Sequence, residues 1–307
     1  MDKWIIITGG CGFIGSHLCK FLLKQNENIL CIDNLQTGFI SNIEYHLDNP
    51  KFKFIEIDIQ SNEFQLLKLP KIKQIYHLAC AASPEKYQKE AIHTIKTCVI
   101  GTLNMLEIAT KNDCPILLSS TSEIYGDPLI SPQNEDYKGN VNSFGPRACY
   151  DEGKRIAETL FYEYKTKYNC KIRVARIFNT YGPNMDINDG RVITNFIKQA
   201  KNNLDITIYG DGSQTRSFCY IDDQINGLVS LMNSNINKPI NIGNPNEYTI
   251  LEVAHIIIKL TNSSSIITFH NLPQDDPKIR CPDISRAKML LGWNPTIELL
   301  EGLSTML

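Results

Sequence analysis

The chain has 307 residues, of which 42% are hydrophobic and 21% charged, and its formal net charge is −2 at pH 7. These values are typical of a globular protein with one large core or two packed lobes. The small net charge gives no reason to expect nucleic acid or an anionic membrane as a partner. No apolar run approaches the ~20 residues that cross a bilayer, and the N-terminus lacks a signal-peptide layout, so we expect a cytoplasmic location.

The ten cysteines favour free thiols over a metal site or a disulfide framework. None belongs to a C-x-x-C pair, and half of them lie inside apolar segments: Cys31, Cys80, Cys98, Cys114 and Cys170. Buried cysteines behave as small hydrophobic side chains. We therefore predict no metal site. Cys149 adjoins a candidate active-site tyrosine, which makes it a candidate for alkylation without a catalytic role.

Short apolar runs alternate with amphipathic stretches through the first half of the chain. The runs predict strands over residues 3–8, 28–32, 52–57, 74–78, 115–119 and 171–176. The amphipathic stretches predict helices over residues 13–25, 91–111 and 149–168. Strands and helices that alternate at this spacing predict an α/β fold with a Rossmann-type, doubly wound parallel sheet.

After about residue 179, turn signals become dense and the predicted elements shorten, as in Tyr181-Gly182-Pro183-Asn184. This change predicts a first, Rossmann-type domain over residues 1–178 and a smaller C-terminal lobe, mainly over residues 179–307. Such a lobe would cover the carboxyl edge of the sheet, where α/β proteins bind ligands. Some later segments, such as residues 222–232, are candidates to return to the first domain.

The strongest local signal is a glycine turn between the first strand and the first helix. Gly9, Gly12 and Gly15 are spaced G-x-x-G-x-x-G, and Phe13 and Ile14 begin the helix. This arrangement suits a tight turn, the approach of a pyrophosphate to backbone N–H groups, and close packing of helix on strand. The sequence therefore predicts a dinucleotide site.

Two carboxylates follow later strands and refine the identity of the dinucleotide. Asp33 ends the second strand, where a carboxylate binds a ribose 2′-hydroxyl and repels a 2′-phosphate. This favours NAD over NADP, although a solvated strand-end carboxylate is an alternative. Asp58 ends the third strand and is a candidate for the adenine edge, with capping nearly as good an interpretation.

Tyr150 and Lys154 stand at positions i and i+4, on one face of a predicted helix. A free phenol has a pKa of ~10 and is a poor base at neutral pH. A neighbouring ammonium and a positive nicotinamide ring would both favour the phenolate, so we expect a lowered pKa for Tyr150. Thr121, Ser122 and Glu123 follow the fifth strand and are expected to face the same crevice, Thr121 beside the reacting hydroxyl.

These residues resemble the extended short-chain dehydrogenase/reductase superfamily, and within it the UDP-glucuronic acid decarboxylases, or UDP-xylose synthases. The similar segments are residues 121–127 (TSEIYGD), 145–155 (GPRACYDEGKR), 175–183 (ARIFNTYGP), 189–193 (DGRVI), 212–216 (GSQTR) and 275–277 (DDP). The resemblance extends over nearly the whole chain. It implies UDP-glucuronic acid as substrate, UDP-xylose as product and NAD as a cofactor that is regenerated through a 4-keto sugar.

The resemblance also implies site residues. Tyr150 would be the base, Lys154 its partner, and Thr121 a hydrogen-bond partner of the sugar. Ser122 and Glu123 would serve decarboxylation and reprotonation, and Arg280 would engage the glucuronate carboxylate. The further cofactor candidates are Asn34, Thr37, Gly38, Ile59, Leu78, Ala79, Thr97 and Thr180. The further substrate candidates are Pro84, Tyr87, Lys96, Asn179, Arg191, Tyr209, Gln214 and Arg216.

The chain departs from the family pattern at several positions without losing a catalytic candidate. Cys98 stands where the family often has asparagine, and Cys80-Ala81 replaces a common Ser-Pro. Both changes fall near the expected cofactor and are expected to alter its affinity. The loop that would cover the sugar carries Glu85 and Lys86 and is more charged than usual.

Several alternatives stay open at this point. A sugar 4,6-dehydratase, a 4-epimerase or a UDP-apiose/xylose synthase would use the same tyrosine–lysine pair. A non-catalytic NAD-sensing protein of the same fold is a further interpretation, against which the intact pair of Tyr150 and Lys154 argues. The two long predicted helices, residues 91–111 and 149–168, are where the resemblance implies a homodimer interface.

Overall fold

The centre of the molecule is a seven-stranded sheet whose neighbouring strands are all parallel, in the order β11-β6-β5-β4-β1-β2-β3. The computed structural model describes residues 3–271 and 279–307. The strands are β1 Trp4–Thr8, β2 Asn28–Asp33, β3 Phe52–Glu56, β4 Ile72–His77, β5 Ile116–Thr121, β6 Ile172–Ile177 and β11 Pro239–Ile242. The order reverses between β1 and β4, which makes this the switch point of a doubly wound fold.

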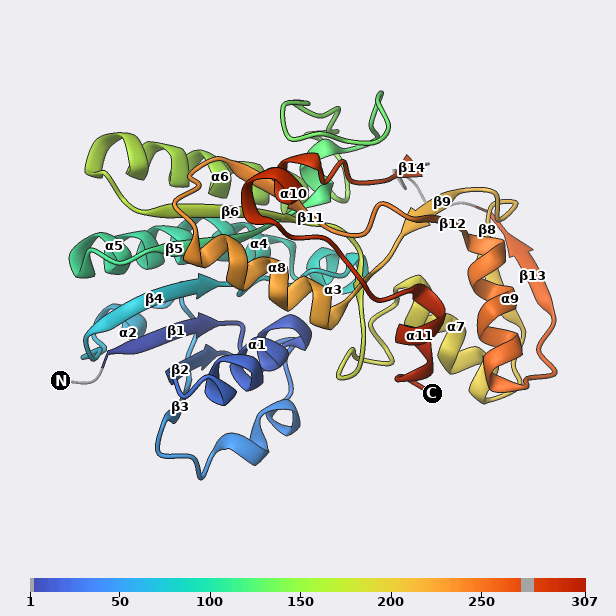
Figure 1. Ribbon diagram of the computed structural model, residues 1–307, viewed down its shortest axis with the longest axis horizontal. Coiled ribbons are helices and arrows are strands. Elements are labelled where there is room, and N and C mark those ends of the chain that lie inside the picture. The colour runs from blue at the N-terminus through green and yellow to red at the C-terminus, as the bar shows by residue number, and fades with distance from the viewer. Residues whose placement is uncertain (1–2, 272–278) are drawn as a thin grey trace.

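Helices cover both faces of the sheet (Figure 1). On one face lie α1 (Phe13–Lys24) and α8 (Ile221–Asn233), and on the other α5 (Thr102–Asn112) and α6 (Ala148–Tyr168). Successive residues of a strand point to opposite faces. Ile5 and Ile7 of β1 accordingly join the core under α1 and α8, whereas Trp4 and Ile6 join the core under α5 and α6. The predicted Rossmann-type α/β fold is confirmed.

All six predicted strands are present, with ends that differ by one or two residues. The predicted helix over residues 91–111 is divided into α4 (Ala91–Lys96), a π-helical turn η3 (Thr97–Gly101) and α5. Such turns carry an extra residue in the helix and are frequent at functional sites. The sequence did not predict the short α3 (Pro84–Lys89), which the loop after β4 forms.

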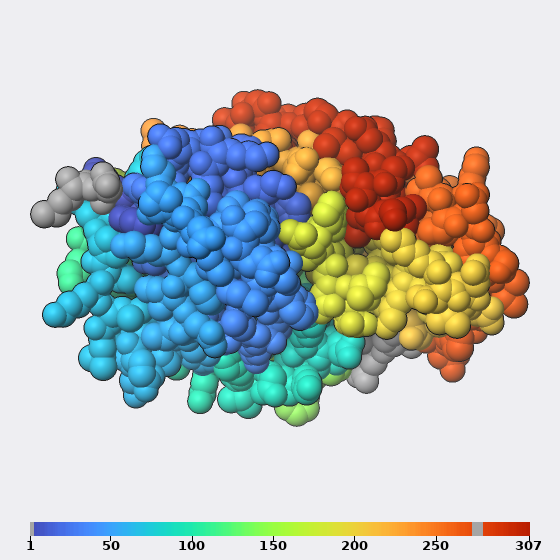
Figure 2. Space-filling view, turned by 90° about the horizontal axis from the view of Figure 1, so that it is seen from below, coloured from blue at the N-terminus to red at the C-terminus, as the bar shows by residue number. Residues whose placement is uncertain are grey.

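The C-terminal lobe lies beyond the carboxyl ends of the strands, on the right of Figure 1 and in yellow to orange in Figure 2. Small sheets pair β13 with β8 and join β12, β9 and β14. Its strands are β8 Ile206–Tyr209, β9 Thr215–Ser217, β12 Glu247–Thr249, β13 Ile267–His270 and β14 Ile279–Arg280. Its helices are α7 Val192–Lys201, α9 Ile250–Thr261 and α11 Leu299–Ser304.

Some segments after residue 178 pack with the large sheet and its helices rather than with the lobe. β11 pairs with β6 at the edge of the large sheet, and α8 contacts α1 and β6. The division into domains between residues 178 and 179 stays a prediction.

The remaining elements are β7 Thr180–Tyr181, β10 Cys219–Tyr220, η1 Ile40–Asn42, η2 Glu44–His46, α2 Asn62–Gln65, η4 Ser122–Tyr125 and α10 Ser285–Leu291. Within residues 3–271 and 279–307, no helix has the length and apolar character of a membrane span.

Candidate active site

A cavity of about 750 Å³ lies between the carboxyl edge of the sheet and the C-terminal lobe. Its walls come from the ends of β1, β2, β4, β5 and β6 and from segments of the lobe. This is the crevice where open α/β sheets bind ligands. All six catalytic candidates line it: Thr121, Ser122, Glu123, Tyr150, Lys154 and Arg280.

The glycine turn forms one end of the cavity. Gly9 has φ +71°, and a Cβ there would lie 2.9 Å from the backbone of Ala79. A Cβ on Gly15 would lie 2.1 Å from the carbonyl oxygen of Gly9, so helix and turn pack in a way that only glycine allows. No side chain caps the first turn of α1, which begins at Phe13. The turn therefore presents backbone N–H groups and the positive end of a helix dipole to the cavity.

Asp33 lines the cavity at the end of β2. Its two carboxylate oxygens accept hydrogen bonds from the backbone N–H groups of Cys11 and Leu35, both at 2.9 Å. Burial raises the pKa of Asp33, and these backbone hydrogen bonds act against the rise. A carboxylate held in this place suits a diol and disfavours a phosphate, as expected for an NAD site.

Asp58 also lines the cavity, but its side chain is engaged by neighbouring residues. Its Oδ2 lies 2.6 Å from Nε2 of His93 and accepts a hydrogen bond from Asn34 at 2.9 Å. Burial acts to raise the pKa of Asp58, yet its hydrogen bonds with Gln60, His93 and Asn34 lower it overall. The carboxylate thus fixes Asn34 and His93 at this corner of the cavity.

Most other cofactor candidates line the same cavity. They are Gly12, Phe13, Ile14, Asn34, Thr37, Ile59, Leu78, Ala79, Thr97 and Thr180. Gly38 does not line it. A Cβ on Gly38 would lie 2.8 Å from the backbone carbonyl carbon of Cys11, so this glycine packs behind the turn.

Tyr150 and Lys154 are both buried on the face of α6 that meets the cavity. The ammonium of Lys154 lies 5.8 Å from the centroid of the Tyr150 ring and donates a hydrogen bond to the carbonyl of Ser119 at 2.8 Å. The Tyr87 ring stacks on Tyr150, with centroids 4.9 Å apart and planes within 5°. The phenol therefore has an aromatic ring stacked on it and a fixed cation nearby.

The expected lowering of the Tyr150 pKa, which invoked a bound nicotinamide ring, is not present in the protein alone. Burial raises the pKa of Tyr150 well above its usual value, and negative charge at Cys80 raises it further. A hydrogen bond with Thr121 favours the phenolate but does not overcome the burial. The sequence showed the spacing of Tyr150 and Lys154 but not how completely the phenol is removed from water.

Glu123 lies between two arginines from distant parts of the chain. Its carboxylate pairs with both terminal nitrogens of Arg280, one at 2.8 Å, and with Nη2 of Arg147 at 2.7 Å. Burial acts to raise the pKa of Glu123, but Arg280 and Arg147 together hold it below its usual value. The carboxylate is therefore ionised and anchors both guanidinium groups in the cavity wall.

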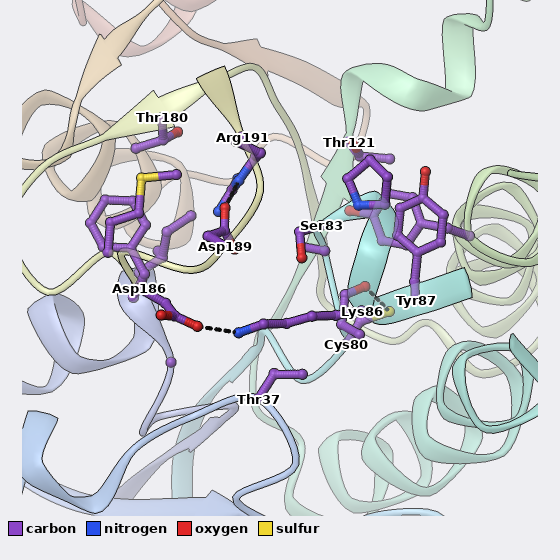
Figure 3. Close-up of a pocket in the computed structure, with 18 of the residues that line it drawn as sticks. Thr37, Cys80, Ser83, Lys86, Tyr87, Thr121, Thr180, Asp186, Asp189 and Arg191 are labelled. Atoms are coloured by element: carbon purple, nitrogen blue, oxygen red, sulfur yellow. Dashed lines mark hydrogen bonds and ion pairs between the residues drawn. The ribbon is translucent and has the colours of Figure 1, made fainter. Parts of the chain in front are cut away.

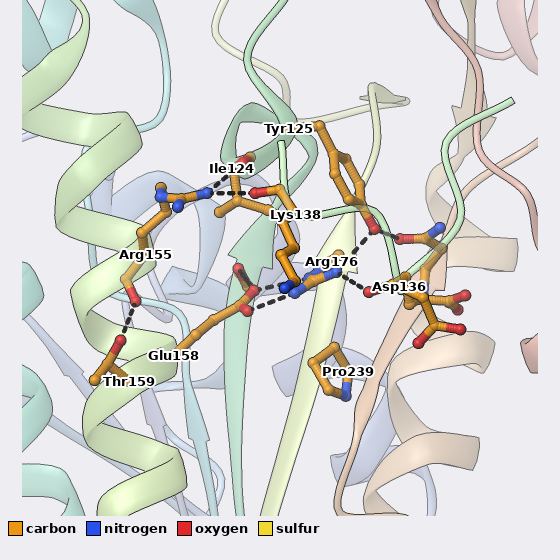
Figure 4. A network of polar contacts seen from close by, with 12 residues as sticks. Ile124, Tyr125, Asp136, Lys138, Arg155, Glu158, Thr159, Arg176 and Pro239 are labelled. Atoms are coloured by element: carbon orange, nitrogen blue, oxygen red, sulfur yellow. Dashed lines mark hydrogen bonds and ion pairs between the residues drawn. The ribbon is translucent and has the colours of Figure 1, made fainter. Parts of the chain in front are cut away.

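A network behind the cavity holds the short η4 helix that carries Glu123 (Figure 4). Arg176 of β6 pairs with Glu158, with Nη2 2.8 Å from Oε2, and donates to the Tyr125 hydroxyl at 3.0 Å. Arg155 donates to the carbonyl of Ile124 at 3.0 Å. The Glu123 backbone is thus fixed by side chains from β6 and α6.

Two polar groups in the cavity wall have no hydrogen-bond partner among the described residues. They are the hydroxyls of Ser83 and Tyr87, at the start of α3. An orphaned buried hydroxyl costs free energy unless a ligand supplies a partner. Both groups lie on the segment expected to cover a sugar, so they mark this end of the cavity as a site for a polar ligand.

An ion pair joins the two sides of the cavity opening (Figure 3). Lys86 of α3 reaches Asp186 of the lobe, with Nζ 2.6 Å from Oδ2, and Arg191 pairs with Asp189 on the same side as Asp186. The other substrate candidates in the cavity wall are Pro84, Asn179, Tyr209, Gln214 and Arg216.

One substrate candidate lies elsewhere. Lys96 is exposed on α4 and lines a small separate hollow with His93 and Ile100, outside the main cavity. The segment 275–277 of the family resemblance lies outside the described residues.

The sequence analysis missed Ser83, Lys86, Arg147 and Asp186 as site residues. Arg147 precedes Tyr150 by three residues and stands within a family motif, so helical spacing offered a signal for it. The meeting of Lys86 with Asp186 spans 100 residues, and no local pattern predicts it.

Comparison with known proteins places the chain among nucleotide-sugar enzymes. The family described as GDP-mannose 4,6 dehydratase matches residues 6–306. UDP-glucuronic acid decarboxylase 1 of Danio rerio is 52% identical over 302 residues, which cover 98% of this chain and 71% of the relative. The chain belongs to the UDP-glucuronic acid decarboxylase family. UDP-glucuronic acid decarboxylase 3 of Arabidopsis thaliana is 50% identical over 303 residues, covering 98% and 87% of the two chains.

Solved structures of related enzymes share the fold of this decarboxylase-family chain. UDP-glucuronic acid 4-epimerase from Bacillus cereus, in complex with UDP-glucuronic acid and NAD, is 30% identical, with a TM-score of 0.87 over 99% of this chain and 97% of that one. UDP-glucose 4-epimerase from Thermotoga maritima, with UDP-glucose, is 27% identical, with a TM-score of 0.91 over 99% and 97%.

Proposed function

We propose that this protein converts UDP-glucuronic acid to UDP-xylose and CO₂, with NAD as a bound cofactor that is regenerated in each turnover. The observation that carries the proposal is the cluster of Glu123, Arg147 and Arg280 in the same cavity as Tyr150 and Lys154. Family membership at about half identity supports the same reaction.

The residues around the glycine turn fit NAD. Neighbouring backbone lies so close to Gly9 and Gly15 that a side chain has no room at either position. The carboxylate of Asp33 at the end of β2 would repel a 2′-phosphate. Related NAD-containing structures support the same choice. NAD, when bound, supplies a reversible hydride acceptor for the C4″ position of the sugar.

Tyr150 is proposed to take the proton of the C4″ hydroxyl. Thr121 is its hydrogen-bond partner, and the Lys154 ammonium is held beside it by the Ser119 carbonyl. Because burial raises the pKa of Tyr150, the protein alone keeps the phenol protonated. A cationic ring bound in the cavity would favour the phenolate, so we propose that Tyr150 becomes a base only in the loaded enzyme.

The arginine cluster is proposed to orient the C6″ carboxylate of the substrate. Glu123 pairs with both guanidinium groups, Arg147 and Arg280. Asp151 also lies near Arg147, with Oδ2 4.0 Å from Nε, and burial and the negative charge of Glu123 raise the pKa of Asp151 to about 7. Two guanidinium groups in the cavity wall suit an anionic substrate group.

Loss of CO₂ becomes favourable once C4″ is a ketone, because the carboxylate is then β to a carbonyl that accepts the electron pair. Arginine contacts that hold the carboxylate tightly would stabilise the ground state and slow this step. The ion pair between Arg280 and Glu123 limits how tightly Arg280 binds the substrate carboxylate, because its guanidinium is shared between the two carboxylates. We propose that Ser122 acts in reprotonation at C5″ and that Glu123, which is ionised, serves decarboxylation by orienting Arg147 and Arg280.

The C-terminal lobe is proposed to bind the UDP group. Arg191 and Arg216 line the cavity there and suit a diphosphate, and Tyr209, which is half exposed, suits stacking on uracil. Asn179 and Gln214 lie in the same wall.

A homodimer through α4, α5 and α6 is also proposed. Ile92 and Tyr162 leave large apolar side chains exposed on this surface.

A second candidate reaction is 4-epimerisation of UDP-glucuronic acid, because a related structure is an epimerase that holds this compound.

One experiment separates the two reactions. Purified protein is incubated with UDP-glucuronic acid and NAD⁺, and CO₂ release and the nucleotide-sugar mass are followed. The proposal requires CO₂ and a UDP-pentose that NMR identifies as UDP-xylose, whereas UDP-apiose would contradict the proposed product. An unchanged mass with altered stereochemistry would instead establish the epimerase.

A further inference from the structure

Two cysteine sulfurs meet in the cavity wall beside the proposed base. Cys80 follows β4 and lines the cavity, and Cys98 lies in the π-helical turn η3. Their Sγ atoms are 3.6 Å apart. Figure 3 shows Cys80 among the residues around the pocket that contains Tyr87 and Thr121. This pair has no part in the reaction proposed above.

The packing around the pair makes room for both sulfurs. Gly153 of α6 faces Cys98, and a Cβ on that glycine would lie 3.1 Å from the Cys98 sulfur. Cys98 is only 3% exposed, whereas Cys80 is partly exposed. A reagent in the cavity therefore reaches Cys80 first, with Cys98 directly behind it.

The two thiols also differ in acidity, and the more acidic one is Cys80, the one that a reagent reaches first. A hydrogen bond from Cys98 lowers the pKa of Cys80, and the positive charges of Lys154 and His93 also favour the thiolate. The same contact raises the pKa of Cys98 well above its usual value. A thiolate beside a protonated thiol is the arrangement found in sensor cysteines with a resolving partner.

The other cysteines lack this combination. Cys80 is the one cysteine of the ten that is not buried, and all ten lie within the described residues. Cys11 and Cys31 are fully buried in the core, where their mutual hydrogen bond and burial keep the pKa of Cys11 raised. Burial also raises the pKa of Cys149, which is close to Tyr150 in sequence. Reactivity toward an oxidant is thus directed to one position.

We propose that Cys80 and Cys98 form an oxidation site at which a peroxide produces a disulfide in the wall of the catalytic cavity. The Cys80 thiolate attacks the peroxide oxygen, which gives a sulfenic acid and hydroxide (water for a protonated leaving group). The Cys98 sulfur then displaces the sulfenic oxygen as water and forms the S–S bond. Overall, two thiols are oxidised by two electrons and the peroxide is reduced.

The cross-link alters the cavity because the sulfurs must approach from 3.6 Å to about 2.05 Å. Cys80 is followed by Ala81 and Ser83, which line the cavity beside Tyr87 and Tyr150. A displacement of about 1 Å in a catalytic site can cost on the order of 100-fold in rate. Oxidation is therefore expected to lower turnover at least tenfold, and a dithiol reductant is expected to restore it.

The test treats fully reduced protein with hydrogen peroxide, blocks the remaining thiols with N-ethylmaleimide and maps the peptides by mass spectrometry. The expected product is one peptide pair linked through Cys80 and Cys98, formed on the order of tenfold faster than modification of any other cysteine. Cys98→Ser should stop at a Cys80 sulfenic acid that dimedone traps. Cys149→Ser is the matched control and should form the same cross-link.

The proposal is overturned if the linked peptide is absent, if it joins another pair, or if linked protein turns over UDP-glucuronic acid at the unmodified rate. The peptide map of the wild-type protein needs neither a variant nor an active enzyme. Only the turnover measurement rests on the proposed function, so failure of that function leaves the test of the oxidation site intact.

Discussion

The end of the cavity beside Gly9 and Asp33 is built mainly from backbone, whereas the end beside Glu123 and Arg280 is built from charged side chains. In the first, three glycines and the start of α1 act within a few residues of one another. In the second, Glu123 meets a partner 157 residues away. We propose that the first end is a general dinucleotide cradle and that the second end selects the reaction of a particular enzyme.

Replacement of Tyr150 by phenylalanine should give the largest effect on turnover. Tyr150→Phe removes the proposed proton acceptor, and we expect kcat to fall by about 10³-fold because general base catalysis is lost. The affinity for NAD should change little, since the glycine turn is untouched. Steady-state kinetics and a binding titration measure the two quantities. Tyr162→Phe, at an exposed tyrosine on the same helix, is the control. Retained turnover in Tyr150→Phe would remove Tyr150 from the mechanism.

Replacement of Glu123 by glutamine tests whether the charged end depends on its ion pairs. Glu123→Gln removes the carboxylate that pairs with both Arg147 and Arg280 in a buried cluster, so we expect a loss of about 3 kcal/mol in the free energy of unfolding. Glu152→Gln breaks a pair with Arg155 that is far more exposed and should cost less than about 0.5 kcal/mol. Chemical denaturation compares the two variants. Equal losses would show that burial of the cluster does not matter.

The stability difference between wild type and Glu123→Gln is expected to depend on pH. The pKa of Glu123 in the folded protein lies below the ordinary value of 4.5, so its stabilisation is complete above pH 4.5 and is lost as pH falls through the folded pKa. The difference in unfolding free energy between wild type and Glu123→Gln should therefore shrink below pH 4.5. A difference that grows on acidification would contradict the assignment.

The two ends of the cavity also differ in how well the sequence predicted them. The glycine turn and Asp33 follow from local spacing, and the six strands follow from short apolar runs. The contact of Glu123 with Arg280 depends on how the C-terminal lobe closes over the sheet, which no local pattern encodes. Burial of Tyr150 is likewise a tertiary property, and for that reason the sequence did not predict that the protein alone raises the pKa of this phenol.

Asp33 provides a smaller test at the backbone end. Asp33→Asn removes the negative charge and keeps one acceptor oxygen, so that one of the two N–H groups, of Cys11 or Leu35, loses its hydrogen bond. We expect NAD to bind about tenfold more weakly, a change of about 1.4 kcal/mol, and the preference over NADP to narrow. Titrations with both dinucleotides measure this, with exposed Asp48→Asn as the control. An unchanged ratio of the two affinities would contradict the proposed contact with ribose.

The smallest expected effect comes from the ion pair across the opening. Lys86→Ala and Asp186→Ala should each raise the KM for UDP-glucuronic acid about twofold, because a partly exposed pair contributes about 0.5 kcal/mol. A double-mutant cycle should show that the two effects are not additive. Independent, additive effects would mean that Lys86 and Asp186 act on the substrate separately rather than through each other.

The cluster of Glu123, Arg147 and Arg280 is proposed to recognise the carboxylate of the substrate. Calorimetry can compare the binding of UDP-glucuronic acid and UDP-glucose to NAD-loaded Tyr150→Phe protein, in which turnover is blocked. We predict at least about tenfold tighter binding of UDP-glucuronic acid, a preference of about 1.4 kcal/mol that Arg280→Gln abolishes. Equal affinities for the two nucleotide sugars, or a preference that survives in Arg280→Gln, would contradict it.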